Sequence, residues 1–205
     1  MSVDAVTIDA YGTLVTLRDP VPALVGALRA RGIERTAEEV EAAFRAEVAY
    51  YVPRSHEGRD EATLALLRCD CAAVFLDAAG AELDPAEFAP AFLAALEFEP
   101  VPGAVEACKA LAERGIAAAV VSNWDVGLRD HLHRLGLDLP VVTSAEAGAP
   151  KPDPAVFRLA LERLGGVPPE RALHVGDSPA DEEGARAAGM QFRPAPLARA
   201  VRELP

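Results

Sequence analysis

Short apolar runs alternate with longer amphipathic segments over most of this chain. Most of the runs are rich in Val, Ile and Ala, which is typical of buried strands, and they fall at residues 3–8, 116–121, 141–143, 172–175 and 190–192. From residue 100 onward, the segments between them have apolar residues at three- and four-residue spacing, which predicts helices. Strands separated by helices of this length imply right-handed crossovers. The pattern therefore predicts an α/β fold, a doubly wound parallel sheet with helices on both faces.

A different pattern fills the gap after the first run. From about residue 20 to 98 the apolar positions recur at helical spacing, and we expect no strand after Leu14 until the core resumes near residue 100. Thr36 and Glu39 form a capping box, which predicts that a helix begins there. The domain prediction is a core made of residues 1–15 and 99–205, with a small helical domain at 16–98 inserted into it.

Charge and cysteine content narrow the possible partners. The 205 residues carry a net charge of -12, and because nucleic acids are bound by basic surfaces, we expect no nucleic-acid partner. No apolar run approaches the length that spans a bilayer, so we expect no membrane partner. Three cysteines do not make a disulfide framework, which favours a reducing, cytoplasmic location. The sequence does not indicate the oligomeric state.

Polar side chains stand where four of the predicted strands end. They are Asp9, Ser122 with Asn123, Lys151 in the loop after the third strand, and Asp177 followed by Asp181. Each alone has a structural explanation: solvation for Lys151, and a turn or a helix cap for the others. The carboxyl ends of parallel strands meet at one edge of the sheet, so together the residues favour a shared ligand site. His174, inside a predicted strand, is expected to be a buried core residue with satisfied hydrogen bonds.

The order and spacing of these segments resemble the four motifs of the haloacid dehalogenase-like (HAD) hydrolase superfamily. The motifs stand at Asp9–Leu14, Ser122–Asn123, Lys151–Pro154 and Gly176–Asp181. The likeness covers nearly the full chain, and the helical block after the first motif resembles the family's helical cap. It implies a Rossmann-like core and a cap that closes over the site and selects a small anionic substrate.

The resemblance implies covalent catalysis by Asp9. Its carboxylate would attack phosphorus or carbon and form an acyl phosphate or an ester, which water then hydrolyses. Lys151 would neutralise negative charge on Asp9 and on the substrate, and Ser122 would hydrogen-bond the transferring group. Asn123, the second residue of the same motif as Ser122, belongs to the expected catalytic set.

The resemblance also implies Mg²⁺ as the cofactor for phosphoryl transfer. The expected ligands are Asp9, the backbone carbonyl of Tyr11 and Asp177, with waters completing an octahedral shell. Asp181 is expected either to bind the ion directly or to orient a water on it. We therefore favour a Mg²⁺-dependent phosphatase that acts on a small phosphate monoester through an aspartyl-phosphate intermediate.

Tyr11 supports an alternative function. Most phosphatases of the superfamily carry a second Asp at this position as general acid and base. The sequence of the first motif here instead resembles that of the 2-haloacid dehalogenases. Those enzymes expel halide, which needs no proton, and work without metal through an aspartyl ester. Arg45 resembles their substrate-carboxylate Arg, but this chain has Phe157 where they carry a Tyr. Tyr11, Thr13, Arg45 and Trp124 are the residues expected to contact the substrate.

The loss of the acid also allows a third interpretation, from a different class of protein. A chain with Tyr11 in that position would bind a phosphorylated ligand without turning it over. Intact Asp9, Lys151 and Asp177 argue against this interpretation, because a binding protein needs no nucleophile.

Overall fold

The computed structural model describes residues 3–204 and divides the chain into two compact units. The core unit takes in the chain up to Thr16 and again from Glu99 onward, and the helical unit is Leu17–Phe98. Residues 1, 2 and 205 of the predicted core domain lie outside the described residues.

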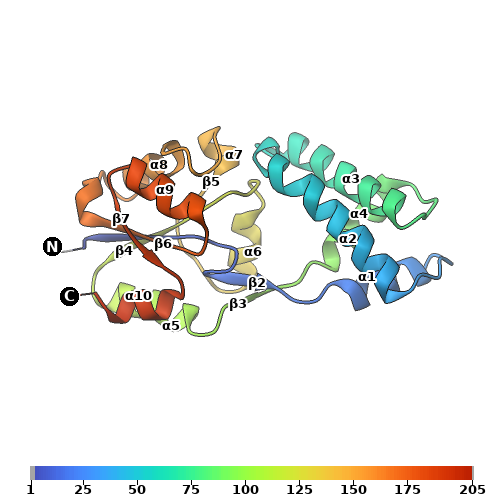
Figure 1. The fold of residues 1–205 in the computed structure, drawn as a ribbon, viewed down its shortest axis with the longest axis horizontal. Coiled ribbons are helices and arrows are strands. Elements are labelled where there is room, and N and C mark those ends of the chain that lie inside the picture. The colour runs from blue at the N-terminus through green and yellow to red at the C-terminus, as the bar shows by residue number, and fades with distance from the viewer. Residues whose placement is uncertain (1–2, 205) are drawn as a thin grey trace. The chain divides into compact units, whose positions relative to one another are not determined.

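The core unit is built on a five-stranded parallel sheet in the order β5-β4-β1-β6-β7 (Figure 1). Its strands are β1 (Ala5–Ile8), β4 (Ala117–Ser122), β5 (Val141–Thr143), β6 (Ala172–Gly176) and β7 (Gln191–Pro194). Ile8 at the end of β1 pairs with Val120 on one side and with Val175 on the other. The three central strands therefore end at one edge of the sheet. The predicted doubly wound parallel α/β fold is confirmed.

Helices cover both faces of this sheet: α8 and α9 lie over one face, and α5 and α10 over the other (Figure 1). The helices of the core unit are α5 (Ala104–Glu113), α6 (Leu128–Arg134), α7 (Ser144–Ala147), α8 (Ala155–Arg163), α9 (Pro179–Ala187) and α10 (Leu197–Arg202), with a 3-10 turn at Pro169–Arg171. In α8, the buried residues Val156, Phe157, Ala160 and Leu161 follow helical spacing. They pack against the sheet with Val121 of β4.

The helical unit contains α1 (Val21–Arg29), α2 (Ala37–Tyr51), α3 (Glu61–Ala78) and α4 (Pro85–Ala94), with a 3-10 helix at Val52–Glu57 after α2. The Thr36–Glu39 capping box predicted from the sequence is present at the start of α2. Asp60 caps α3 in the same way, and Asp84 caps α4 ahead of a proline at the first helical position.

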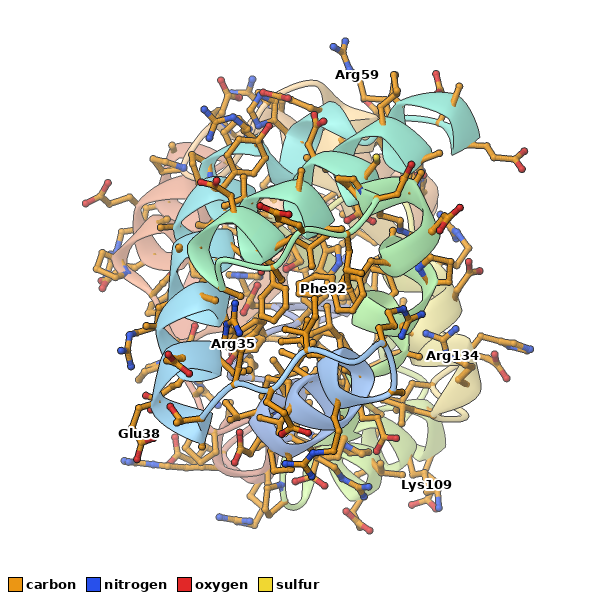
Figure 2. The ribbon with its side chains drawn as sticks, turned by 90° about the vertical axis from the view of Figure 1, so that its right-hand side faces the viewer. Arg35, Glu38, Arg59, Phe92, Lys109 and Arg134 are labelled. Atoms are coloured by element: carbon orange, nitrogen blue, oxygen red, sulfur yellow. The ribbon has the colours of Figure 1, made fainter. Side chains whose placement is uncertain are left out.

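Aromatic residues fill the centre of the helical unit. The ring of Phe75 stacks on Phe88 at 5.9 Å between centroids and lies 5.2 Å from Phe92. Figure 2 shows Phe92 inside the unit, whereas Glu38 and Arg59 extend outward from it. None of the helices within residues 3–204 has both the length and the apolar composition needed to cross a bilayer.

The prediction that no strand lies between Leu14 and about residue 100 is wrong. β2 (Val15–Leu17) and β3 (Phe98–Pro100) form a two-stranded sheet where the chain passes between its two units. The pairing continues into the next residues, where the Arg18 N–H donates to the Glu97 carbonyl at 2.9 Å. Each strand has only three residues, and the partner lies some eighty positions away, so no local alternation reveals either one. Helix α10 was likewise not predicted.

Candidate active site

Asp9 stands at the first position after β1, at the edge where the central strands end. All four residues of β1 are buried, and the Asp9 N–H donates to the Val175 carbonyl of β6 at 2.9 Å. This hydrogen bond continues the sheet by one residue and fixes the backbone of Asp9. Asp9 is buried, with 5% of the residue exposed.

Two donors hold one oxygen of the Asp9 carboxylate. Ser122 Oγ at the end of β4 donates to Oδ1 at 3.2 Å, and Lys151 Nζ donates to the same oxygen at 2.5 Å. Oδ2 accepts no hydrogen bond from residues 3–204. Burial raises the pKa of Asp9 to about 6, although Lys151 acts to lower it. The oxygen without a partner is free to act as a nucleophile or a metal ligand.

Lys151 is the cation at the centre of the site. Besides Asp9, its Nζ donates to Asp181 Oδ1 at 2.5 Å and to the Val121 carbonyl at 3.3 Å, so all three protons of the ammonium have acceptors. Burial acts to lower the pKa of Lys151, but the carboxylates of Asp9 and Asp181 outweigh this effect and raise the pKa. Lys151 therefore stays charged.

Asn123 holds the backbone of Lys151. Its side-chain Nδ2 donates to the Lys151 carbonyl at 3.2 Å, and its Oδ1 accepts from the Lys151 N–H at 2.6 Å. A single side-chain amide thus pairs with both polar groups of one residue. Asn123 therefore sets the position of Lys151 through the backbone of the lysine. None of the hydrogen bonds of the Asn123 side chain in the described chain reaches Asp9.

Asp181, in the first turn of α9, has donors on both of its oxygens. Oδ1 lies 2.5 Å from Lys151 Nζ and 3.0 Å from His174 Nε2. Oδ2 accepts from the hydroxyl of Ser178 at 2.6 Å and from its N–H at 3.1 Å. Burial works to raise the pKa of Asp181, but these hydrogen bonds and the charge of Lys151 hold it well below the usual range. Asp181 is therefore an ionised carboxylate with two donors on each oxygen.

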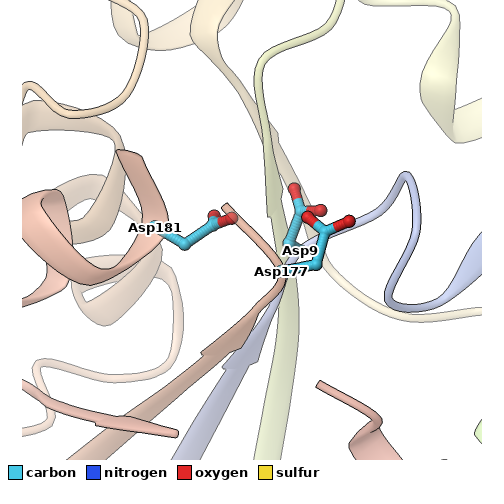
Figure 3. Close-up of side chains that lie close together, drawn as sticks. All are labelled: Asp9, Asp177 and Asp181. Carbon is cyan, nitrogen blue, oxygen red and sulfur yellow. The ribbon is translucent and has the colours of Figure 1, made fainter. Parts of the chain in front are cut away.

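Asp177 completes a group of three carboxylates. One oxygen each from Asp9, Asp177 and Asp181 lies within 4.8 Å of the other two, and Figure 3 shows Asp177 beside Asp9. Asp177 is exposed, and partial desolvation together with Asp181 raises its pKa. Three hard oxygen donors at such distances suit a small divalent cation such as Mg²⁺.

The loop after Asp9 is shaped to admit Asp177. Gly12 has φ +81°, and a Cβ on it would lie 2.1 Å from Asp177 Oδ2. Any other residue would strain this left-handed backbone, and its Cβ would displace the Asp177 carboxylate. The glycine of the first motif brings the backbone next to the carboxylate of the fourth.

The four residues predicted to contact the substrate differ in their exposure and in the unit to which they belong. Tyr11 is 52% exposed, whereas Thr13 is fully buried and its hydroxyl has no partner within the described chain. Trp124 is buried, with its backbone bonded to Ser144. Arg45 belongs to α2 of the helical unit, where it pairs with Glu41.

Two buried residues next to the site were not assigned to it from the sequence. His174 is a satisfied core residue, as predicted, since Nδ1 lies 2.8 Å from Thr7 Oγ1. Its other nitrogen reaches Asp181, so His174 also belongs to the surroundings of the site. The sequence does contain an indication of both residues, because Thr7 and His174 are each a polar residue inside an apolar strand. Only the register, which pairs Thr7 with His174, shows that the two meet.

The fold, and the residues at the edge of the sheet where the strands end, define an α/β protein with a buried site of carboxylates and a lysine. Comparison with known proteins identifies the family. The chain belongs to the haloacid dehalogenase-like hydrolases, because the model of that family matches residues 3–189. This membership confirms the resemblance identified from the four motifs.

The relatives include proteins named only for the family's domain and proteins named as phosphatases. The chain is 48% identical to the haloacid dehalogenase-like hydrolase domain-containing protein 3 of Mus musculus over 93 residues, which are 43% of this chain and 36% of that protein. It is 40% identical to a phosphoglycolate phosphatase of Rhodospirillum rubrum over 150 residues, 71% of this chain and 55% of the relative. The chain thus spans about half, or less, of the length of these relatives.

A solved structure with a similar fold carries the other activity. The L-2-haloacid dehalogenase from Xanthobacter autotrophicus superposes with a TM-score of 0.64 at 27% identity, over 93% of this chain and 76% of that one. The chain is therefore similar both to a phosphatase and to a dehalogenase. These are the two activities between which Asp177 and Tyr11 left the sequence interpretation open.

Proposed function

We propose that the chain is a Mg²⁺-dependent phosphatase that acts on small phosphate monoesters through an aspartyl-phosphate formed on Asp9. The observation that carries this proposal is the position of Asp177 beside Asp9, with their oxygens and one of Asp181 within 4.8 Å. A metal-free reaction has no need of a further carboxylate at this place, since it adds negative charge beside the nucleophile. The likeness to a phosphoglycolate phosphatase agrees with the proposal.

The donor set fits Mg²⁺. We propose Asp9, Asp177 and the backbone carbonyl of Tyr11 as its ligands, so the exchange of an acidic side chain for Tyr at position 11 leaves the ligand set intact. When bound, the ion supplies positive charge that offsets the charge of the phosphoryl group and of both carboxylates. Asp181, with two donors on each oxygen, acts on Lys151 instead.

The first chemical step is attack by Asp9 on phosphorus. Oδ2, which accepts no hydrogen bond from the described residues, forms the new P–O bond while the bond between phosphorus and the ester oxygen breaks. Lys151 and Ser122 remain on Oδ1, where they orient the carboxylate, and the Lys151 ammonium offsets the charge that gathers on the transferring group. Water then attacks the phosphorus, releases phosphate and regenerates Asp9.

Tyr11 limits which ester oxygen leaves readily. No carboxylate stands at position 11 to protonate the departing oxygen, so the leaving group departs as an anion or takes its proton from water. We therefore propose that the preferred substrates have acidic leaving groups, such as aryl or acyl phosphates. The helical unit, which carries Arg45, is proposed as the cap that selects among them.

Dehalogenation of a 2-haloacid is the second candidate, supported by Tyr11 and by the likeness to the Xanthobacter dehalogenase. In that reaction Asp9 attacks carbon, halide leaves without a proton, and water hydrolyses the ester. Arg45 would then bind the substrate carboxylate. The reaction assigns no role to Asp177, and for this reason it ranks second.

One paired assay separates the candidates. Purified protein is tested on p-nitrophenyl phosphate with Mg²⁺ and on 2-chloropropionate without metal, with Asp9→Asn as the control. Phosphate release that requires both Mg²⁺ and Asp9 is the expected result. Halide release without metal would assign the dehalogenase function. No turnover, with beryllium fluoride still bound at Asp9, would leave a phospho-ligand binding protein.

A further inference from the structure

Thr7 and His174 form a polar pair in the middle of an apolar sheet. They face each other in the register of β1 and β6, neither is exposed, and Thr7 Oγ1 lies 2.8 Å from His174 Nδ1. Burying a hydroxyl and an imidazole costs free energy unless both are fully hydrogen-bonded. An apolar pair would fill the same space without that requirement, so the polar pair calls for a role.

The hydrogen bonds of His174 specify one tautomer. Nε2 lies 3.0 Å from Asp181 Oδ1, and because an ionised carboxylate only accepts, the proton is on Nε2. A second proton would put a positive charge on a fully buried ring that shares Asp181 Oδ1 with the Lys151 ammonium, so Nδ1 carries no proton and is an acceptor. The Thr7 hydroxyl therefore donates to Nδ1, and in doing so it excludes the tautomer in which His174 cannot donate to Asp181.

Packing holds the ring in the same orientation. Phe157 of α8 meets His174 edge to face, with centroids 4.9 Å apart and planes at 86°. Phe157 takes this position because α9 has a glycine next to it: a Cβ on Gly184 would lie 2.4 Å from Phe157 Cε2. The imidazole is thus held by hydrogen bonds at both of its nitrogens and by its contact with the ring of Phe157.

The donor from His174 determines what Asp181 offers to Lys151. His174 and Lys151 share Oδ1 of Asp181, and the pair of donors from Ser178 holds Oδ2. If His174 no longer donates, Oδ1 keeps Lys151 as its one donor from the described residues, and the position of this oxygen is less firmly fixed. The acceptor that keeps Lys151 Nζ against Asp9 is then less precisely placed.

We propose that Thr7 and His174 are positioning residues, which act through Asp181 to hold the Lys151 ammonium on the Asp9 nucleophile. The proposal rests on the proposed function for its kinetic consequence, but the chain of hydrogen bonds that it describes exists with any substrate. Neither residue touches the reacting atoms. Their effect is therefore expected in the rate of the chemical step rather than in substrate binding.

The test uses two substitutions at Thr7 that differ in the donor. Thr7→Val keeps the shape and removes the hydroxyl, whereas Thr7→Ser keeps the hydroxyl and removes a methyl group. With p-nitrophenyl phosphate and Mg²⁺, Thr7→Val is expected to lower kcat about tenfold at unchanged KM, the effect of one lost hydrogen bond. Thr7→Ser is expected to recover most of that loss. Equal losses in both variants, or an unchanged kcat in Thr7→Val, would overturn the proposal.

A measurement independent of activity separates this proposal from the proposed function. Long-range ¹H–¹⁵N NMR of the full chain reports the tautomer of His174, expected as Nε2–H in the wild type and as a mixture in Thr7→Val. An Nδ1–H tautomer in the wild type would refute the positioning role even in an active phosphatase. If the protein hydrolyses no phosphate ester but shows the expected tautomers, the proposed function fails and the hydrogen-bond chain stands.

Discussion

Glu47→Gln tests how a buried acid makes the stability of this fold depend on pH. Glu47 lies on α2 one helical turn beyond Ala43, and only 5% of its surface is exposed. Burial raises the pKa of its carboxyl group from 4.5 to about 7, while a hydrogen bond with Cys71 acts to lower it. The folded chain therefore favours the neutral acid at this position.

The sign and size of the effect follow from the two pKa values. Because the folded pKa lies above the unfolded one, Glu47 contributes its full stability below pH 4.5 and loses it as the pH rises to about 7. At 1.36 kcal/mol for each unit of pKa, the loss amounts to about 3 kcal/mol. Gln has nearly the same size and is neutral throughout, so the variant lacks this loss.

Urea unfolding followed by far-UV circular dichroism from pH 4 to pH 8 gives the free energy of unfolding of each protein. From pH 4 to pH 8, the free energy of unfolding of Glu47→Gln is expected to rise by about 3 kcal/mol relative to that of the wild type. Glu82→Gln, at an exposed position of the same unit, is the matched control and is expected to show no such shift. A difference that stays constant with pH would refute the assignment of a raised pKa to Glu47.

Three further substitutions test the site. Gly12→Ala places a methyl group 2.1 Å from Asp177 Oδ2 at φ +81°, so Mg²⁺ affinity measured by calorimetry is expected to fall at least tenfold; unchanged affinity would contradict the proposed ligand set. Lys151→Met leaves two buried carboxylates without their shared cation and is expected to destabilise the protein by about 3–5 kcal/mol in denaturant unfolding, as well as abolish turnover. Tyr11→Asp is expected to accelerate hydrolysis of alkyl phosphates about a hundredfold, with a smaller gain for p-nitrophenyl phosphate; equal gains would argue against a missing general acid.

The sequence predicts the sheet well because each of its strands has a local signature. The runs that end at Asp9 and at Ser122 are apolar and bounded by turn residues, so their type and order follow without knowledge of their partners. β2 and β3 have no such signature. Each contains three residues, and the hydrogen bonds that define them exist only once distant segments meet.

The candidate site divides in the same way. That Asp9, Ser122, Lys151 and Asp177 gather at one edge follows from parallel topology, since each residue stands near a strand end. What each residue does to its neighbours depends on side-chain geometry, which no spacing specifies. The hold of Asn123 on the Lys151 backbone is of this second kind, because the two residues are twenty-eight positions apart.

Asp177 and Tyr11 favour different functions, and their electrostatic costs are unequal. Tyr11, two residues after the nucleophile, is exposed and adds no acidic side chain, so it fits either reaction without penalty. Asp177 adds a third carboxylate to a place where Lys151 is already shared by Asp9 and Asp181, and the repulsion from Asp181 helps to raise its pKa. Without a cation, this arrangement destabilises the site. A bound divalent ion would remove that cost, and for this reason Asp177 has more weight than Tyr11 in our proposal of phosphoryl transfer.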